Sequence, residues 1–278
     1  MMNRRAIIAI ARKDIRSITA NIQVWLPMFM VPIIFSVLLP IIVAFSARAS
    51  QGDIVSDMQI ILDMLEKLPE SSLRRIVGSL RTDQQKIAYI MFNYFMSPFF
   101  LMIPLMAAST VSIDSFVGEK ERGTLEGLLL ASVNMRSIFT AKVLAAFLPA
   151  IGVSLVSFVL FGVCANVSAW PLFGKIFFPH INWAPLVLLV MPAVSLFAIL
   201  INVFISARVS TFQAGYQLGA LLVLPLLAVM IGQFTGFMLL DTRILLAIGA
   251  ILVSVDYALL RIIVRRLDRA WLFESQVR

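Results

Sequence analysis

A short charged segment after the second long apolar run has the residue types and spacing that most suggest a function. Within residues 114–130, four consecutive charged residues, Glu119-Lys120-Glu121-Arg122, follow the apolar run directly. On a helix, Glu119, Arg122 and Glu126 would share one side, because residues three and four apart are neighbours. Leucines would form the opposite, apolar side. We therefore expect a helix that lies half in a membrane surface and presents its charges to water.

Local stability does not explain this density of charge. A surface pair such as Arg122–Glu126 contributes only ~0.3 kcal/mol to a helix. One interpretation is therefore a docking surface for another protein. The other is an ordinary solvated loop, in which acidic residues are favoured near a helix start by the helix dipole. The residues alone leave both interpretations open.

The motifs of catalysis are missing from the chain. It has no Gly-x-x-x-x-Gly-Lys-Ser/Thr loop, so it has no recognisable cradle for nucleotide phosphates. It has one histidine, His180, and one cysteine, which do not give the spacing of a metal site. We predict that the chain is not an enzyme and holds no cofactor. Any ATP and magnesium would then belong to a partner subunit.

A few polar residues interrupt the apolar runs and are candidates for a transport path. Each such residue is also a candidate for a hydrogen bond between helices. Asp256 is the only acid well inside a predicted span. A charged group there would cost about 3 kcal/mol at the bilayer centre, so a buried structural pair and an ion- or proton-linked role both stay open. The candidates are Thr110, Asn202, Gln217, Gln233 and Asp256.

The composition requires lipid as the solvent for much of the chain. Of 278 residues, 60% are apolar and 14% are charged, whereas soluble domains have about a quarter charged. The net charge of +8 could suggest nucleic-acid binding. The Lys and Arg residues cluster at the ends of apolar runs, however, as expected beside an anionic membrane leaflet. We expect a bilayer partner and no nucleic acid.

Six apolar runs are long enough to cross a membrane as helices, which needs about 20 residues each. Lys and Arg number 15 in the segments on the side of the N-terminus and 8 in the alternate segments. This bias predicts that both termini are cytoplasmic. The spans are expected near 24–46, 91–114, 140–164, 184–206, 213–238 and 244–264.

Segments outside the spans have patterns of their own. Residues 1–22 are predicted to form a basic amphipathic helix flat on the cytoplasmic interface, with Ile7, Ile8, Ile15 and Ile18 on one face. The segment 48–90 has two apolar stripes separated by a proline, typical of two helices on the outer surface or of a lid over an exit route. In the fifth run, Gly232 and Gly236 follow Pro225, which fits either close helix packing or a break with a re-entrant turn.

Four stretches resemble one known family. Glu119 to Glu126, followed by paired leucines, resembles the coupling segment of bacterial type-two ABC exporter permeases. Arg12-Lys13-Asp14 resembles the family's amphipathic entry helix, and Lys142 its lysine after the coupling loop. Ser210-Thr211-Phe212-Gln213-Ala214, before the fifth span, is also similar. The family often has a proline beyond the leucines, where this chain has Ala131-Ser132-Val133-Asn134.

The resemblance implies a subunit of six helices that pairs with a second copy or a homologous permease. It also implies that the segment 115–132 rests on a separate ATP-binding-cassette ATPase subunit and passes the closure of that subunit to the helices. The expected coupling residues are Glu119, Lys120, Glu121, Arg122, Gly123, Thr124, Leu125 and Glu126.

Together these inferences predict an all-α integral membrane protein with six transmembrane helices, an N-terminal interfacial amphipathic helix and a cytoplasmic coupling helix. We expect a permease domain over 23–266 and a cytoplasmic tail over 267–278. The function expected is the permease subunit of an ATP-driven exporter in the bacterial inner membrane. The alternatives are an ion-coupled secondary transporter that uses Asp256 and a non-transporting membrane anchor for a cytoplasmic partner.

Overall fold

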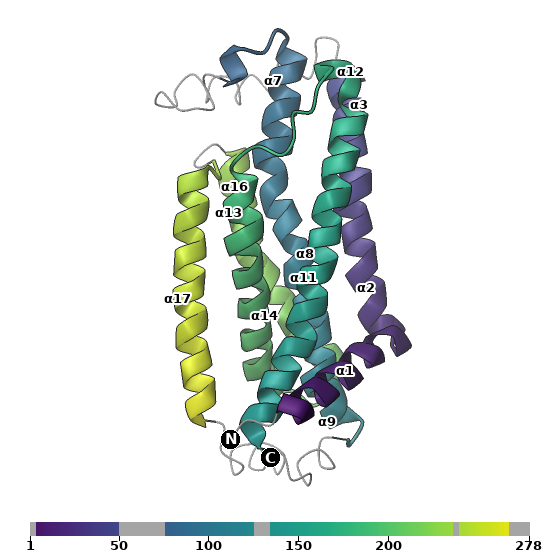
Figure 1. The fold of residues 1–278 in the computed structure, drawn as a ribbon, viewed down its shortest axis with the longest axis vertical. Helices are drawn as coiled ribbons and strands as arrows, with labels where there is room; N and C mark the ends of the chain where they lie inside the picture. Colours follow the sequence, from purple (N-terminus) through teal and green to yellow (C-terminus); the bar gives the residue numbers. More distant parts are fainter. Residues whose placement is uncertain (1–3, 50–75, 125–133, 236–238, 267–278) are drawn as a thin grey trace.

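The chain folds into a bundle of long, roughly parallel helices (Figure 1). The computed structural model describes residues 4–49, 76–124, 134–235 and 239–266, and every regular element in these ranges is helical. The described residues contain six helical runs long and apolar enough to cross a membrane, which confirms the predicted number. These runs are Val24–Arg48, Asp83–Glu121, Met135–Ser168, Trp183–Ser206, Phe212–Phe234 and Thr242–Arg265.

Several spans are built from more than one helical element, because single π-helical or 3₁₀ turns interrupt them. The first span contains α2 (Ile22–Ile33), η1 (Ile34–Leu38) and α3 (Leu39–Ala49). The second contains α7 (Asp83–Ile90), η2 (Met91–Phe95), α8 (Met96–Ile113), η3 (Asp114–Gly118) and α9 (Glu119–Glu121). The third is α11 (Met135–Ser168), followed by α12 (Trp170–Phe173).

The fourth and fifth spans are also built from several elements, whereas the sixth is one helix. The fourth contains α13 (Trp183–Pro185), η4 (Leu186–Val190) and α14 (Met191–Ser206). The fifth contains α15 (Phe212–Ala220), η5 (Leu221–Val223) and α16 (Leu224–Phe234), and the sixth is α17 (Thr242–Arg266). Between η5 and α16 the run continues as helix past Pro225, which lies in the first turn of α16, where proline is tolerated. Gly236 lies outside the described residues.

The second span forms the centre of the bundle. In its most apolar window 83% of the residues are buried, against 11% in the fifth span and 17% in the sixth. It begins earlier than the predicted 91–114. A capping box starts α7, in which the Gln85 N–H donates to Thr82 Oγ1 and the Thr82 N–H donates to the Gln85 side chain. The residues 83–90 therefore belong to this span and not to a separate outer segment.

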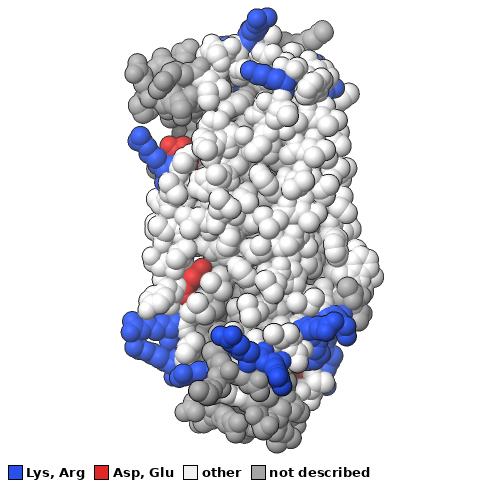
Figure 2. All heavy atoms as spheres, in the orientation of Figure 1, with Lys and Arg blue, Asp and Glu red and all other residues white. Residues whose placement is uncertain are grey.

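The two ends of the bundle differ in content. We call the end with α1 (Arg4–Ala20) and α9 the α1 end, and the opposite end, with α12, the α12 end (Figure 1). Most Lys and Arg side chains visible in Figure 2 lie at these two ends, and a broad band almost without charged side chains separates them, with one acidic group visible in its lower part. This distribution agrees with a multi-pass membrane protein.

The α1 helix lies across the end of the bundle and packs against α11. Its buried face consists of Ile7, Ala11, Asp14 and Ile18. Of the predicted isoleucine face, Ile7 and Ile18 are buried against the bundle, whereas Ile8 is 67% exposed. Contact with α11 selects a face rotated from the one that the isoleucine spacing indicates. The position of α1 at a lipid interface stays a prediction.

The α12 end is held together by neutral polar groups around Asn93, which lies in η2 and is fully buried. Its Oδ1 accepts a hydrogen bond from the His180 N–H at 3.0 Å. Its carbonyl oxygen accepts hydrogen bonds from Asn182 Nδ2 at 2.6 Å and Trp183 Nε1 at 3.1 Å. We call this group the asparagine clamp. It ties the connection between the third and fourth spans to the central span.

Part of the predicted outer segment cannot be compared with the structure. Residues 50–75, with the first apolar stripe and Pro69, lie outside the described ranges. Of the second stripe, Ile76, Val77 and Leu80 pack against Tyr89, Tyr94 and Phe95 of the central span. The choice between two surface helices and a lid stays open.

Candidate functional site

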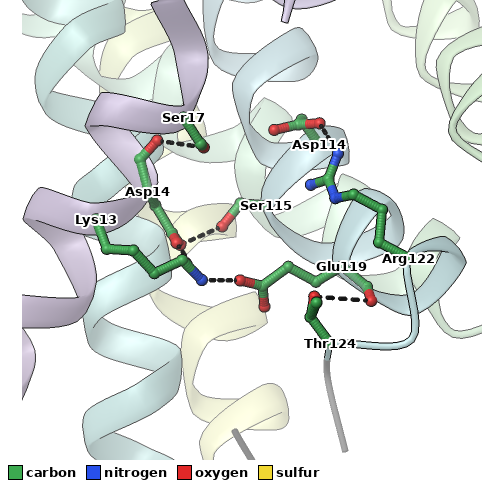
Figure 3. A pocket seen from close by; sticks show the side chains of 8 residues that line it. All are labelled: Lys13, Asp14, Ser17, Asp114, Ser115, Glu119, Arg122 and Thr124. Atoms are coloured by element: carbon green, nitrogen blue, oxygen red, sulfur yellow. Dashed lines mark hydrogen bonds and ion pairs between the residues drawn. The ribbon is translucent and has the colours of Figure 1, made fainter. Parts of the chain in front are cut away.

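A group of charged side chains from three distant segments meets at the α1 end. Lys13 and Asp14 come from α1, Glu119 comes from the end of the second span, and Lys142 comes from the second turn of α11. We call these four residues the charge cluster; three of them are labelled in Figure 3. Two ammonium groups face two carboxylates, so the charges balance within the cluster.

Lys142 is the centre of the charge cluster, and only 2% of its side chain is exposed. Its Nζ lies 2.6 Å from Glu119 Oε2 and 3.6 Å from Asp14 Oδ2. It also donates a hydrogen bond to the Ser115 carbonyl oxygen and lies 5.4 Å from the centre of the Phe116 ring. A buried ammonium group is costly unless it is paired and hydrogen-bonded, and here both conditions are met.

The Lys13 side chain closes the cluster on its water-facing side. Its Nζ forms an ion pair with Glu119 and lies 3.2 Å from Asp14 Oδ1. Burial acts to lower the pKa of Lys13, but the hydrogen bond to Glu119 and the charge of Asp14 outweigh it and raise the pKa above its ordinary value. Asp14 Oδ2 also accepts a hydrogen bond from Ser115 Oγ at 2.8 Å.

A second ion pair lies one turn away, between Arg122 and Asp114. Arg122 Nη1 donates to Asp114 Oδ1 at 3.1 Å, and Asn21 Nδ2 donates to the same oxygen at 3.1 Å. Gly118 lies directly between the two partners. A Cβ at Gly118 would be 2.8 Å from Asp114 Oδ1 and 3.0 Å from Arg122 Nη2. The absence of a side chain at this position therefore permits the pair.

The same short segment also contacts the start of the fifth span. Glu121 Oε2 accepts a hydrogen bond from the Phe212 N–H, the first of α15, at 2.7 Å. Lys120 Nζ donates to the Val209 carbonyl oxygen at 3.2 Å. A carboxylate at a helix N-terminus satisfies a free N–H group and interacts favourably with the helix dipole. Glu121 thus holds the start of α15 from outside that helix.

The helix ends earlier than the sequence pattern predicts. Regular helix stops at Glu121, and Gly123 has a φ of 68°, the left-handed conformation that commonly ends helices. Thr124 then folds back, and its N–H and Oγ1 both donate to the Glu119 carbonyl oxygen. Of the predicted shared face, Glu119 and Arg122 line one cavity but have different partners: Glu119 reaches towards Lys13, whereas Arg122 reaches towards Asp114 (Figure 3). Glu126 lies outside the described residues.

The expected coupling residues divide into an internal and an external set. Glu119 is buried because it pairs with α1 and α11, and Lys120 is half-buried against the connection before α15, where it donates to the Val209 carbonyl oxygen. Leu125, Glu126 and the following residues up to 133 lie outside the described ranges. The exposed members are Glu121, Arg122, Gly123 and Thr124.

The four stretches of family resemblance meet at this one place in the structure. Glu119 joins Lys13 and Lys142, and Glu121 joins Phe212. Sequence reasoning noted these stretches separately and did not predict that they touch. It also omitted Asp114 and Ser115 from the site. The available signal was charge inside or beside apolar runs, notably at Asp14 and Lys142, since such charges need partners.

A cavity of about 190 Å³ lies beside the charge cluster. All eight side chains that line it are polar or charged, and Figure 3 shows them converging from α1 and the end of the second span. They are Lys13, Asp14, Ser17, Asp114, Ser115, Glu119, Arg122 and Thr124.

The candidate path residues do not form a common lining. Thr110 is buried and donates to the Met106 carbonyl oxygen, whereas Gln217 is exposed on α15. Asn202 donates to Ser112 Oγ at 2.9 Å, and Gln233 donates to the Tyr94 carbonyl oxygen at 3.2 Å. The second-span partners of these two residues are separated by about 27 Å along the helix. Asn202 and Gln233 are therefore helix-to-helix contacts at different levels.

Asp256 has a different environment from the other candidates. It is 3% exposed, and neither carboxylate oxygen has a hydrogen-bond partner in the described part of the chain. The structural pair considered for Asp256 is therefore not observed among the described residues, and Tyr257 and Arg261, which follow it on α17, are both exposed. Asp256 belongs to the face of α17 that includes the buried residues Gly249 and Ile263.

Comparison with known proteins identifies one family. The family model described as "ABC-2 family transporter protein" matches residues 8–259, most of the chain. No curated protein matches the chain, and no solved structure does.

Proposed function

The chain belongs to the ABC-2 family of transporter proteins, and from this premise we propose that it is the permease subunit of an ATP-driven exporter. Family membership supports an ABC permease role and an ATP-binding-cassette ATPase as partner. Coupling through residues 119–124, outward transport and pairing of two permeases are parts of our proposal. In this proposal, ATP and magnesium bind to the ATPase subunit.

The observation that carries the proposal is the set of attachments made by the segment 119–122. Glu119 is paired with α1 and α11, and Glu121 holds the N-terminus of α15. Four residues therefore connect three helices other than their own to one exposed turn. A push on that turn by an ATPase subunit would reach the first, third and fifth spans together.

The mechanism follows from contacts that differ between two states. ATP-driven closure can shift the helices only if the ATPase binds one arrangement of this segment better than the other. Hydrogen bonds and ion pairs exchange partners within a few ångströms, so the contacts of Glu119 and Glu121 are suitable parts of such a switch. The exposed side chains of Glu121 and Arg122 are the proposed contacts with the ATPase.

Charge distribution supports an orientation with the α1 end in the cytoplasm. The start of α1 and the end of α17 lie at that end of the bundle (Figure 1). Five cations lie on α1, and three lie near the end of α17. They are Arg4, Arg5, Arg12, Lys13 and Arg16 on α1, and Arg261, Arg265 and Arg266 on α17. Positive residues favour the cytoplasmic side. We propose the bacterial inner membrane as the location, with both termini inside.

Replacing Glu121 by alanine tests the proposal. We expect Glu121→Ala to insert normally and to lower permease-stimulated ATP turnover at least tenfold, because the link from the ATPase to α15 is removed. The measurement uses the purified permease with its ATP-binding-cassette ATPase partner, identified by co-purification, in lipid vesicles. Asp83→Ala is the matched control, since Asp83 is an exposed acid near the opposite end of the same span.

Two results would contradict the proposal. Equal ATP turnover in wild type and Glu121→Ala would remove the role of this link. If the variant Thr124→Cys is labelled at position 124 only from the outer side of intact cells, the α1 end lies outside. This result would contradict the proposed orientation.

The buried carboxyl group of Asp256 favours one second candidate, an ion-coupled carrier. Burial without a described partner suits a group that binds a proton or cation during transport. This candidate predicts proton flux through permease vesicles without any ATPase, measured with an internal pH dye and lost in Asp256→Asn. Such flux would contradict the ATP-driven mechanism and support the ion-coupled carrier.

A further inference from the structure

A small cleft, separate from the cavity beside the charge cluster, lies where the second span meets the fifth. Its volume is about 30 Å³, and the described residues that line it belong to α8, α15 and η5. Most of these residues are apolar, but Ser109 of α8 and Gly219 of α15 are also among them. The helices α8, α14 and α15 pack against one another, so the fourth span also takes part in this contact.

Two buried side-chain oxygens at this contact have no hydrogen-bond partner in the part of the chain that the structure describes. They are Ser109 Oγ and Asn202 Oδ1. Ser109 is 6% exposed and Asn202, on α14, is fully buried. A Cβ added to Gly219 would lie 3.1 Å from Asn202 Oδ1, so this oxygen lies next to the wall that α15 contributes to the cleft. Unpaired buried polar atoms are rare because each one costs free energy, and these two therefore indicate a bound ligand.

The neighbouring hydrogen bonds fix the direction of the Asn202 amide. Ser112 Oγ donates to the Ser109 carbonyl oxygen at 3.0 Å, so its own hydrogen is used. Asn202 Nδ2 donates to Ser112 Oγ at 2.9 Å. A reversed amide would present an oxygen to Ser112 Oγ, which has no second hydrogen to donate. Asn202 Oδ1 therefore faces Gly219, and its ligand must donate a hydrogen bond.

We propose that this cleft binds water, which bridges Ser109 and Asn202 and forms a movable joint between the second, fourth and fifth spans. We call it the water joint. A water molecule needs roughly 10–15 Å³ of such space, so the cleft holds about two of them and no larger ligand. Water both donates and accepts, so it satisfies the Asn202 oxygen and the Ser109 hydroxyl together. Ordered water commonly satisfies polar groups inside membrane helix bundles.

Gly219 keeps the cleft open. A Cβ at this position would lie 2.9 Å from Ile113 Cδ1 and 3.1 Å from Asn202 Oδ1, within the space that water would occupy. Gly215, one turn earlier, offers a matched comparison. A Cβ there would lie 3.0 Å from Ile113 Cγ2, and its other nearest atoms belong to apolar side chains. Alanine at either position therefore crowds Ile113, but at 219 it also meets the Asn202 oxygen.

The water joint lies on the helix that Glu121 holds. Glu121 accepts the hydrogen bond of the Phe212 N–H, and Gly219 lies about 10 Å further along α15. Within α15 the buried residues are Gly215 and Gly219. A water-mediated hydrogen bond is nearly as favourable as a direct one, and water can re-form it at a new position. The α15 helix can therefore shift along α8 without leaving the two oxygens unpaired. This role rests on the proposed coupling function, whereas the binding of water does not.

The first experiment locates the water by X-ray hydroxyl-radical footprinting of the purified permease in lipid nanodiscs, without its ATPase. The X-ray pulse converts bound water to radicals in place, so a methionine beside that water is oxidised to its sulfoxide. In wild type, Met106, which lines the cleft, should be oxidised several-fold faster than Met102. Met102 is also half-buried on α8 but does not line the cleft.

Glycine variants then connect the water to the cleft. In Gly219→Ala, oxidation of Met106 should fall about fivefold or more, because the alanine Cβ takes the space of the water. Gly215→Ala is the matched control and should stay close to wild type. If Gly219→Ala does not fold, Ser109→Ala gives the same readout, since it removes one of the two polar partners of the water.

The second experiment tests whether the Ser109 hydroxyl has a partner. Removing a buried hydroxyl that is hydrogen-bonded to water lowers stability, whereas removing an unpaired one raises stability or leaves it unchanged. We therefore expect Ser109→Ala to lower the thermal midpoint of the purified permease. Ser195→Ala is the control for loss of a buried hydroxyl, since Ser195 Oγ donates to the Met191 carbonyl oxygen of its own helix.

The third experiment measures the role of the joint in coupling. ATP turnover of the assembled complex, stimulated by the permease, should fall several-fold in Gly219→Ala and should change little in Gly215→Ala.

The outcomes separate this inference from the proposed function. Equal oxidation of Met106 in Gly219→Ala and Gly215→Ala would overturn the water site, and so would a higher thermal midpoint in Ser109→Ala. Lower oxidation in Gly219→Ala with unchanged ATP turnover would support the water site and contradict its role in moving α15. Lower oxidation in Gly219→Ala, together with normal ATP turnover in Glu121→Ala, would support the water site and contradict the coupling proposal.

Discussion

The two ends of the second span use different chemistry to hold their neighbours. At the α12 end, η2 carries the asparagine clamp, in which neutral amide, indole and backbone groups satisfy one another. At the α1 end, η3 and α9 carry Ser115 and Glu119, which bind ammonium and carboxylate groups. Both polar groups thus lie in or next to a π-helical turn of one helix, a feature that is frequent at functional sites.

This difference suggests that the two ends of the second span have different roles. Neutral hydrogen bonds in a buried clamp fix one geometry. Ion pairs beside an exposed turn can be rearranged by a partner's charges, because their strength depends on the local dielectric and on nearby charge. We interpret the α12 end as a fixed support and the α1 end as the part that responds to other molecules.

The largest expected effect comes from removing the central cation. Lys142→Met leaves Asp14 and Glu119 buried with one fewer partner, so we expect a loss of ~3–5 kcal/mol of stability. Thermal unfolding in detergent, followed by size-exclusion chromatography, measures it. Lys175→Met is the control, since Lys175 is exposed at the α12 end.

A double variant distinguishes a lost ion pair from a general packing defect. Lys142→Met with Glu119→Gln removes one charge of each sign and leaves Lys13 with Asp14. The double variant should be more stable than Lys142→Met alone, because buried pairs can be replaced together at low cost. Additive losses in the two single variants would argue against the charge cluster as a unit.

A smaller effect is expected at the clamp. Asn93→Ala removes the acceptor of the His180 N–H and should cost about 1–3 kcal/mol, as for other unsatisfied buried groups. Permease-stimulated ATP turnover per folded molecule should stay within about twofold of wild type, unlike that of Glu121→Ala. Gln213→Ala, at an exposed amide, is the control for stability. A large loss of permease-stimulated ATP turnover in Asn93→Ala would contradict the proposal that the α12 end is only a fixed support.

The smallest effect concerns pH. Burial lowers the pKa of His180, although its contact with Asn182 acts in the other direction. The unfolded chain therefore binds the proton more tightly, so stability should fall as pH decreases below about 6.5. Because the pKa of Lys13 is raised, its contribution to the free energy of unfolding should be lost only above pH 10.5. Thermal midpoints between pH 5.5 and 7.5 should therefore change less in His180→Gln than in wild type.

Much of the fold could be predicted from the chain because the bilayer imposes strict lengths and polarity. Six apolar runs of about 20 residues give six spans, and the structure confirms the number. The boundaries of the second span were missed, since its caps at Thr82 and Gly123 lie outside the apolar run that hydropathy detects. Local signals for these caps were present in the residue types.

The candidate site was only half predictable. Glu119 and its neighbours were identified from their density of charge, but Glu119 was expected at a contact with another protein and is buried against Lys142. Periodicity says which side of a helix a residue occupies and not what packs there. For the same reason α1 buries Ala11 and Asp14, whereas Ile8 stays exposed.

The sequence by itself determined that this chain is a membrane protein, how many times it can cross the bilayer and where its unusual charges lie. The reason is that the free energy of transfer between water and lipid is a local property of each residue type. Only the tertiary structure decided which charges meet. Lys13, Glu119, Lys142 and Phe212 come together because helix packing, which depends on the shape of all faces at once, brings distant segments to one end of the central span.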